Sequence, residues 1–152
     1  MFIEQLTNAD ALPTLERMAQ FAARRQDLLA HNIANLSTPG FQQRDVSTAD
    51  FQASLREAVD RRRSATGGVR GDLPLADSRE VRIDRTGSLS LTPSTDSGGG
   101  GGGGGVLFHD RNNRDLERLM QDLVENLSAF RLAGDLLRNR MGLLQSAIAE
   151  RV

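Results

Sequence analysis

The sequence predicts a mainly α-helical protein whose long N-terminal and C-terminal helices pair as a coiled-coil hairpin. Near each end of the chain, apolar residues recur at alternating steps of three and four, the spacing of a helix that buries one narrow face against another helix. The middle of the chain is instead rich in glycine and arginine and interrupted by proline. We therefore expect both ends to form one structural domain, joined by a largely disordered or short β middle segment.

The expected N-terminal helix covers residues 10–37 and is followed by a tight turn. Pro39 disfavours the helical conformation at Thr38, and the pair Pro39-Gly40 is typical of a turn, so the helix is expected to end near Ser37. The residues expected along its seam are Leu12, Leu15, Ala19, Ala22, Gln26, Leu29, Ile33 and Leu36. Small and polar members make this seam weaker than its C-terminal counterpart.

An extended stretch and a short helix around residues 50–59 are expected to complete the N-terminal region, residues 1–60. The next segment, residues 61–105, contains three consecutive arginines and ends in an eight-glycine run. Such a composition cannot bury enough apolar surface to offset an ordering cost of ~1–2 kcal/mol per residue, so we expect a flexible insert. Within it, the alternating stretches 81–83 and 89–91 predict a hairpin, formed when a neighbouring molecule supplies a strand edge.

The C-terminal region, residues 106–152, is expected to hold the longest helix, from residue 115 to residue 150. Asn112, Asn113 and Asp115 favour its start, because their side chains accept hydrogen bonds from the free N–H groups of a first turn. The expected seam consists of Leu116, Met120, Leu123, Leu127, Phe130, Gly134, Leu137, Met141, Leu144 and Ile148. We expect Gly134 to allow a close helix approach, and the helix lengths permit either parallel or antiparallel pairing.

Composition and motifs exclude several classes of function. A formal net charge of −1 argues against bulk binding to nucleic acid, and the absence of cysteine excludes disulfides and thiolate zinc sites. His31 and His109 lie far apart, and no hydrolase, metalloprotease or phosphate-loop motif is present, so we expect no catalytic, cofactor or metal site. No apolar run is long enough to span a bilayer, and residues 1–6 lack the features of a cleaved signal peptide.

A motif at the end of the N-terminal helix carries a family resemblance. Asn32-Ile33-Ala34-Asn35, followed two residues later by Thr38-Pro39-Gly40-Phe41, resembles a box shared by the bacterial flagellar axial proteins, the rod and hook family. Residues 112–117 and the following Met120 are similar to the segment that opens the C-terminal helix of the proximal rod proteins. Because the insert between the two helices is short, the chain most resembles one of these proximal rod proteins, with its sister type as the alternative.

The resemblance implies a structural subunit of the periplasmic rod that stacks helically with copies of itself and with other rod subunits and the adaptor at the membrane ring. It also implies export through the flagellar type III apparatus, which requires no cleaved signal peptide. Asn32 and Asn35 are candidates for hydrogen bonds to neighbouring subunits or to the turn, although both residues also suit simple helix termination. A coiled-coil adaptor or regulator of the export system that never polymerises stays open as an alternative, whereas a peptidoglycan-degrading enzyme is disfavoured because no catalytic motif is present.

Overall fold

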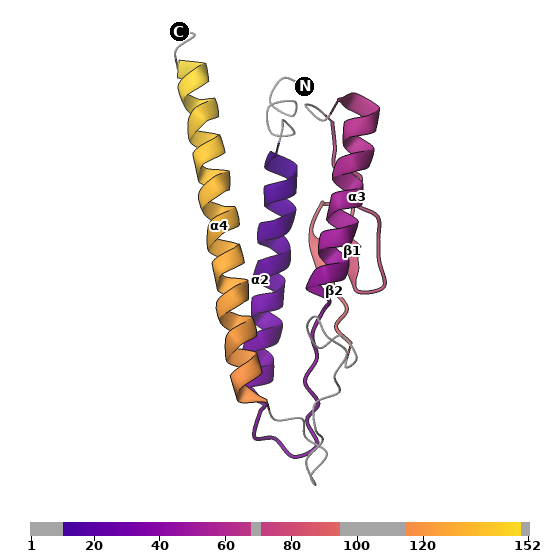
Figure 1. Cartoon of the computed structure of the whole chain (residues 1–152), viewed down its shortest axis with the longest axis vertical. Coiled ribbons are helices and arrows are strands. Elements are labelled where there is room, and N and C mark those ends of the chain that lie inside the picture. Colours follow the sequence, from indigo (N-terminus) through magenta and orange to yellow (C-terminus); the bar gives the residue numbers. More distant parts are fainter. Residues whose placement is uncertain (1–10, 68–70, 95–114, 150–152) are drawn as a thin grey trace.

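The computed structural model describes residues 11–67, 71–94 and 115–149 as three layers of elongated elements (Figure 1). The elements are helix α2 (Leu12–Ala34), helix α3 (Thr48–Thr66), strand β1 (Val81–Ile83), strand β2 (Leu89–Leu91) and helix α4 (Leu116–Ala149). Helix α2 lies between α4 on one side and α3 with the hairpin on the other. Helices α2 and α4 run antiparallel, which decides between the two pairings that the sequence permits. The architecture confirms the predicted mainly helical fold.

Helix α2 is shorter than its seam predicts at the C-terminal end. Pro13 occupies the first turn, where its missing N–H costs no hydrogen bond. The helix ends at Ala34, and Asn35 caps it by donating its backbone N–H to the carbonyl of His31 at 3.1 Å. Residues 35–40 then form turns, so the predicted end near Ser37 lies within the turn region.

Helix α3 is longer than the short helix predicted around residues 50–59. It begins where the Ser47 hydroxyl accepts a hydrogen bond from the Asp50 N–H at 3.1 Å, and it ends where Gly67 takes a left-handed φ of 72°. The arginine run, predicted to be flexible, continues the helix. Its middle member Arg62 is buried on the same face as Leu55 and Ala58. Because Arg62 is buried, the helix continues into the segment predicted to be disordered. The charge of the arginine run gives no sign of this burial in the sequence.

The two strands pair as an antiparallel hairpin with Val81 opposite Leu91 and Ile83 opposite Leu89. The residue ranges match the prediction, but the expectation that a neighbouring molecule must supply an edge is wrong. Val81 and Leu89 are buried in a hydrophobic core within the same chain. A backbone bridge between Asp45 and Ser94 adds a further attachment to the stretch that follows α2.

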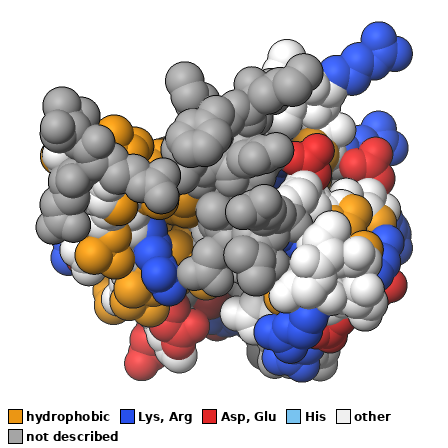
Figure 2. Space-filling view, turned by 90° about the horizontal axis from the view of Figure 1, so that it is seen from above, with side chains coloured by type: hydrophobic (Ala, Val, Ile, Leu, Met, Phe, Trp, Pro, Cys, Tyr) orange, Lys and Arg blue, Asp and Glu red, His pale blue; other side chains and the backbone are white. Residues whose placement is uncertain are grey.

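The hydrophobic core joins α2, α3 and the hairpin. The rings of Phe21 and Phe51 stack at its centre with centroids 3.9 Å apart. The core consists of Phe21, Val46, Phe51, Leu55, Ala58, Leu73, Val81 and Leu89. None of these residues belongs to α4, which is buried against α2 only at Leu119, Asn126 and Ala133 within its described length. Seen from above, hydrophobic side chains gather on the side of the molecule where α4 lies (Figure 2).

Candidate assembly site

The turn after α2 is fixed by short backbone hydrogen bonds. The N–H of Thr38 donates to the Asn35 carbonyl at 2.9 Å, and the N–H of Phe41 donates to the Thr38 carbonyl at 3.2 Å. Gly40 has a φ of 72°, which a residue with a Cβ adopts only under strain. Thr38, Pro39 and Gly40 are exposed, so the surface of the turn is accessible to solvent in the single chain.

Asn32 fastens the chain that leaves the turn to the end of α2. Its side chain is 2% exposed; the amide donates to the Arg44 carbonyl at 2.7 Å and accepts from the Arg44 N–H at 3.2 Å. Asn35 is half-buried and donates to the carbonyl of His31 at 2.9 Å. Of the two predicted asparagines, Asn32 therefore binds the returning chain and Asn35 terminates its own helix.

Phe41, the last residue of the box, folds back onto the helix end. Its half-buried ring meets the ring of His31 edge to face, with centroids 5.7 Å apart and an interplanar angle of 63°. This contact and the two hydrogen bonds of Asn32 attach the turn and the chain after it to the end of α2.

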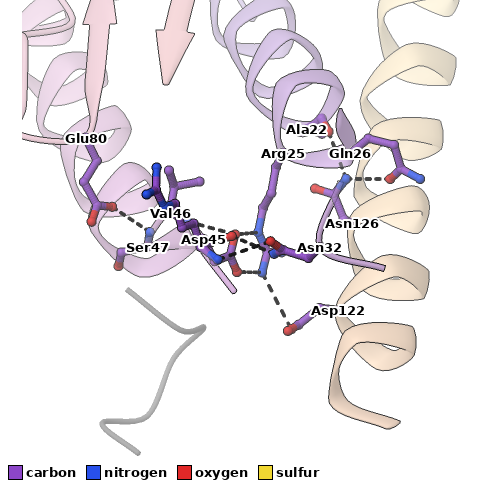
Figure 3. Close-up of polar contacts among 11 residues, drawn as sticks. Ala22, Arg25, Gln26, Asn32, Asp45, Val46, Ser47, Glu80, Asp122 and Asn126 are labelled. Carbon is purple, nitrogen blue, oxygen red and sulfur yellow. Dashed lines mark hydrogen bonds and ion pairs between the residues drawn. The ribbon is translucent and has the colours of Figure 1, made fainter. Parts of the chain in front are cut away.

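A buried ion pair lies one step further from the turn. The Arg25 guanidinium donates from Nε to Asp45 Oδ1 at 3.0 Å and from Nη2 to Asp45 Oδ2 at 2.6 Å, the two-pronged geometry that guanidinium and carboxylate favour. Asp45 Oδ1 also accepts from the N–H of Val46 at 2.8 Å. On the other side, Asp122 of α4 lies 3.6 Å from Arg25 Nη2 (Figure 3). Arg25 thus joins α2, the chain after the turn, and α4.

Burial and neighbouring charges shift the pKa values of this cluster. Burial alone would lower the pKa of Arg25, but its hydrogen bond to Asp45 and the charges of Asp45 and Asp122 raise that pKa above its usual value. Burial raises the pKa of Asp122, and the nearby Asp45 charge adds to the rise while Arg25 opposes it. The charged form of Arg25 is therefore stabilised, whereas ionisation of Asp122 costs free energy in the folded chain.

A second polar contact fixes how far α4 is shifted along α2. Asn126 is 4% exposed and donates to the Ala22 carbonyl at 2.8 Å and to Gln26 Oε1 at 2.9 Å. Sliding α4 by one turn would leave this buried amide without these partners, which is how a single polar seam residue specifies register in helix pairs. The hydrogen bond from Asn126 accounts for a polar residue, Gln26, at a predicted seam position.

The predicted seams are only partly buried within the chain. On α2, Leu15 and Leu29 are buried and Ile33 is half-buried. On α4 the half-buried seam members are Leu123, Leu127, Gly134, Leu137 and Leu144. The exposed members are Leu116, Met120, Phe130, Met141 and Ile148, with exposed fractions between 41% and 53%. Many seam positions therefore keep apolar surface that the described chain does not cover.

The three buried residues of α4 each lie one position before a residue of the predicted seam. Leu119, Asn126 and Ala133 precede Met120, Leu127 and Gly134, respectively, and they repeat every seven residues. The expectation that Gly134 permits a close helix approach is wrong within the chain, because a Cβ at Gly134 would meet no atom within 4 Å. Ala133, which is 0% exposed, supplies the close contact instead. The glycine run and residues 112–114 lie outside the described residues.

Within the described ranges, no group of three His, Asp or Glu side chains is placed to hold a metal ion. None of the described helices has the length and apolar character required to cross a membrane. The recognisable features of the site are instead the turn, its polar attachments and the apolar face of α4.

Comparison with known proteins shows the family. The model for the family described as "Flagella basal body rod protein" matches residues 15–42, which comprise most of α2 and the turn. The flagellar basal body rod protein FlgB of Salmonella typhimurium is 31% identical over 89% of this chain and 93% of its own length. The chain belongs to the flagellar basal body rod protein family.

Other members of the rod family give the same result. FlgB of Borrelia hermsii is 30% identical over 71% of this chain and 73% of its own length. FlgB of Escherichia coli is 42% identical over a shorter stretch, which covers 39% of this chain and 41% of its own length. These relatives favour the FlgB type over its sister proximal rod protein FlgC.

Proposed function

We propose that this chain is a structural subunit of the proximal flagellar rod that polymerises helically through its N- and C-terminal helices, transmits torque and forms part of the export channel wall. The observation that carries the proposal is the combination of the rod-family box with a long helix whose apolar side chains are left exposed. Leu116, Phe130 and Met141 are each more than 40% exposed, a state that costs free energy in water and is relieved by contact with another subunit.

The geometry around the box suits a part that must carry load. Arg25 connects α2, α4 and the chain after the turn, and Asn32 attaches that chain a second time. A turn held at both sides moves with the helix pair as one body, so force applied at Thr38, Pro39 or Gly40 reaches the helices. We propose that these exposed turn residues contact adjacent rod subunits, and that the adaptor at the membrane ring is a further partner.

Delivery to the periplasm is proposed to use the flagellar type III apparatus without a cleaved signal peptide. Passage through a narrow channel requires unfolding. The longest helix packs on α2 and lies outside the hydrophobic core that joins α2, α3 and the hairpin, so it can separate without disrupting that core. This arrangement supports the proposed route.

The test is deletion of the gene, followed by electron microscopy of purified basal bodies and a swimming assay. Membrane rings without a rod, in non-motile cells that regain rods when the gene is restored, are the expected result. Intact rods and swimming cells would overturn the proposal and favour the non-polymerising adaptor.

A further inference from the structure

The C-terminal end of α4 extends beyond the helix on which it packs (Figure 1). Asn126 donates hydrogen bonds to Ala22 and Gln26, so it lies opposite the middle of α2. Because the two helices are antiparallel and each rises about 1.5 Å per residue, Leu12 at the start of α2 lies level with about residue 138 of α4. Residues 139–149, which we call the overhang, continue for roughly 16 Å past that level.

The overhang prolongs the side of α4 that packs on α2. Leu144 follows the buried Asn126 by 18 residues, which is five helical turns, so the two side chains project in the same direction. Ile148 lies one turn further on the same side. Leu144 is half-buried and Ile148 is 53% exposed. These two residues, which we call the strip, carry the α2-facing side of α4 past the start of α2.

The chain that precedes α2 is attached at the base of the overhang. Ala11 is the N-cap of α2, and residues 1–10, which lie outside the described part of the chain, come directly before it. Ten extended residues reach about 33 Å, which exceeds the length of the overhang. They include the apolar residues Phe2, Ile3 and Leu6. A segment tethered this closely has an effective concentration on the order of millimolar, an advantage over a separate molecule.

Charge also favours contact between the overhang and the start of the chain. Residues 136–149 contain two arginines and no acidic residue, whereas residues 1–10 contain two acidic residues and no arginine or lysine. Arg140 precedes Leu144 by one turn and therefore borders the strip. Pairing the overhangs of two copies would bring like charges together, whereas the start of the chain brings the opposite charge.

We propose that the N-terminal segment covers the strip of its own chain, with the side chains of Phe2, Ile3 and Leu6 placed against it. This contact attaches α4 at a second point, far from the register contact at Asn126. It leaves the outer side of the overhang, where Leu143 is 63% exposed, available to other molecules. The inference does not rest on the proposed rod function, because both partners belong to one chain.

Disulfide cross-linking of the purified full-length protein tests the contact, since the chain has no native cysteine. A variant with Leu6→Cys and Leu144→Cys is expected to form a disulfide within one chain. The matched control combines Leu6→Cys with Leu143→Cys, which lies at nearly the same height but about 100° around the helix. Leu143 is the more exposed of the two leucines, so accessibility alone would favour the control.

The products and their rates of formation decide the outcome. Faster formation of the intrachain disulfide in the Leu144→Cys variant than in the Leu143→Cys control supports the proposal. Equal rates, or a faster control, would overturn it. Disulfide-linked dimers as the main product of the Leu144→Cys variant would also overturn it and would assign the strip to a second copy. Circular dichroism of the reduced variants checks that each one folds.

Hydrogen exchange of the full chain gives a second test that needs no cysteine. Phe2→Ser, Ile3→Ser and Leu6→Ser, combined in one variant, should speed amide exchange in residues 139–149. Exchange in residues 119–133 should not change, because α2 still packs on them. The control variant combines Gln5→Ser with Asn8→Ser, two polar positions of the same segment. Unchanged exchange of the overhang in the first variant, or equal acceleration in the control, would overturn the proposal.

Discussion

At the scale of single residues, Asn32 is the residue of the box with the clearest role inside the chain. Replacing this buried residue by alanine would remove both of its side-chain hydrogen bonds, to the N–H and to the carbonyl of Arg44. We expect Asn32→Ala to lower the free energy of unfolding by about 1–3 kcal/mol. Asn35→Ala, which removes a hydrogen bond within its own helix end, is the matched control and should lower it by less. Urea titration followed by circular dichroism measures both; equal losses would contradict the assigned roles.

Gly40 offers a test that separates backbone strain from assembly. Gly40 and Gly67 both have a φ of 72°, and in both cases a Cβ would meet no atom within 4 Å. Valine at either position should therefore cost a similar ~1–3 kcal/mol of stability through backbone strain alone. We expect only Gly40→Val to abolish rod assembly, because its turn is the proposed contact surface, while Gly67→Val cells swim. The measurement is swimming together with rod counts by electron microscopy, and identical phenotypes would argue against a special role for the turn.

The stability of the folded chain should depend on pH through Asp122. Its pKa is raised in the folded chain, chiefly by burial, so the folded state holds the proton more tightly than the unfolded state does. The contribution of Asp122 to stability is then fully present at pH values below the unfolded pKa, and it is lost as pH rises through the folded pKa. Asp122→Asn should therefore raise the free energy of unfolding at about pH 7 and change it little at about pH 3. Thermal unfolding at both pH values is the check, and a loss of stability at neutral pH would show that attraction to Arg25 dominates.

The roles of individual residues were only partly predictable from sequence. The box itself is a local pattern, so its turn and helix end could be located. The Arg25–Asp45 pair is separated by 20 residues, and nothing in an Arg-Arg dipeptide distinguishes a buried arginine from a solvated one. Only the fold brings the two groups together.

At the scale of elements, α4 should be the least stable of the described helices. It has no residue in the hydrophobic core that joins α2, α3 and the hairpin, and it is held by the hydrogen bonds of Asn126 together with the packing of Leu119 and Ala133. We expect its amides to exchange with solvent deuterium at a lower opening free energy than those of α3. Hydrogen exchange measured by mass spectrometry on the full chain tests this; equal protection of both helices would mean that the chain unfolds as a single unit.

The helices themselves follow from sequence better than their contacts do. Seven-residue periodicity predicted both long helices, yet the buried line of α4 is displaced by one residue from part of the predicted seam. The reason is that Asn126 occupies the buried position: an amide there is recognised only once the carbonyl of Ala22 is seen opposite it. Periodicity of apolar residues also cannot distinguish a face buried within the chain from one left for a neighbour.

At the scale of the whole molecule, the mainly helical hairpin was predictable and the packing of its middle was not. The stacked rings of Phe21 and Phe51 bring α3 and the hairpin against α2, through contacts distant in sequence. The molecule therefore has two parts. One is the core formed by α2, α3 and the hairpin. The other is the long helix α4, which is attached to α2 through buried Asn126 and has exposed apolar side chains on its outer faces. We infer that this division lets α4 serve two partners, its own α2 and the neighbouring subunits.

Electron cryomicroscopy of basal bodies purified from swimming cells would show directly how this chain packs in the rod. We expect the proximal rod to contain several copies of this chain in a helical arrangement, each with α2 antiparallel to α4. Leu116, Phe130 and Met141, exposed in the single chain, should be buried against adjacent subunits. A rod in which this chain is absent, or present without contact between α4 and another subunit, would contradict this expectation.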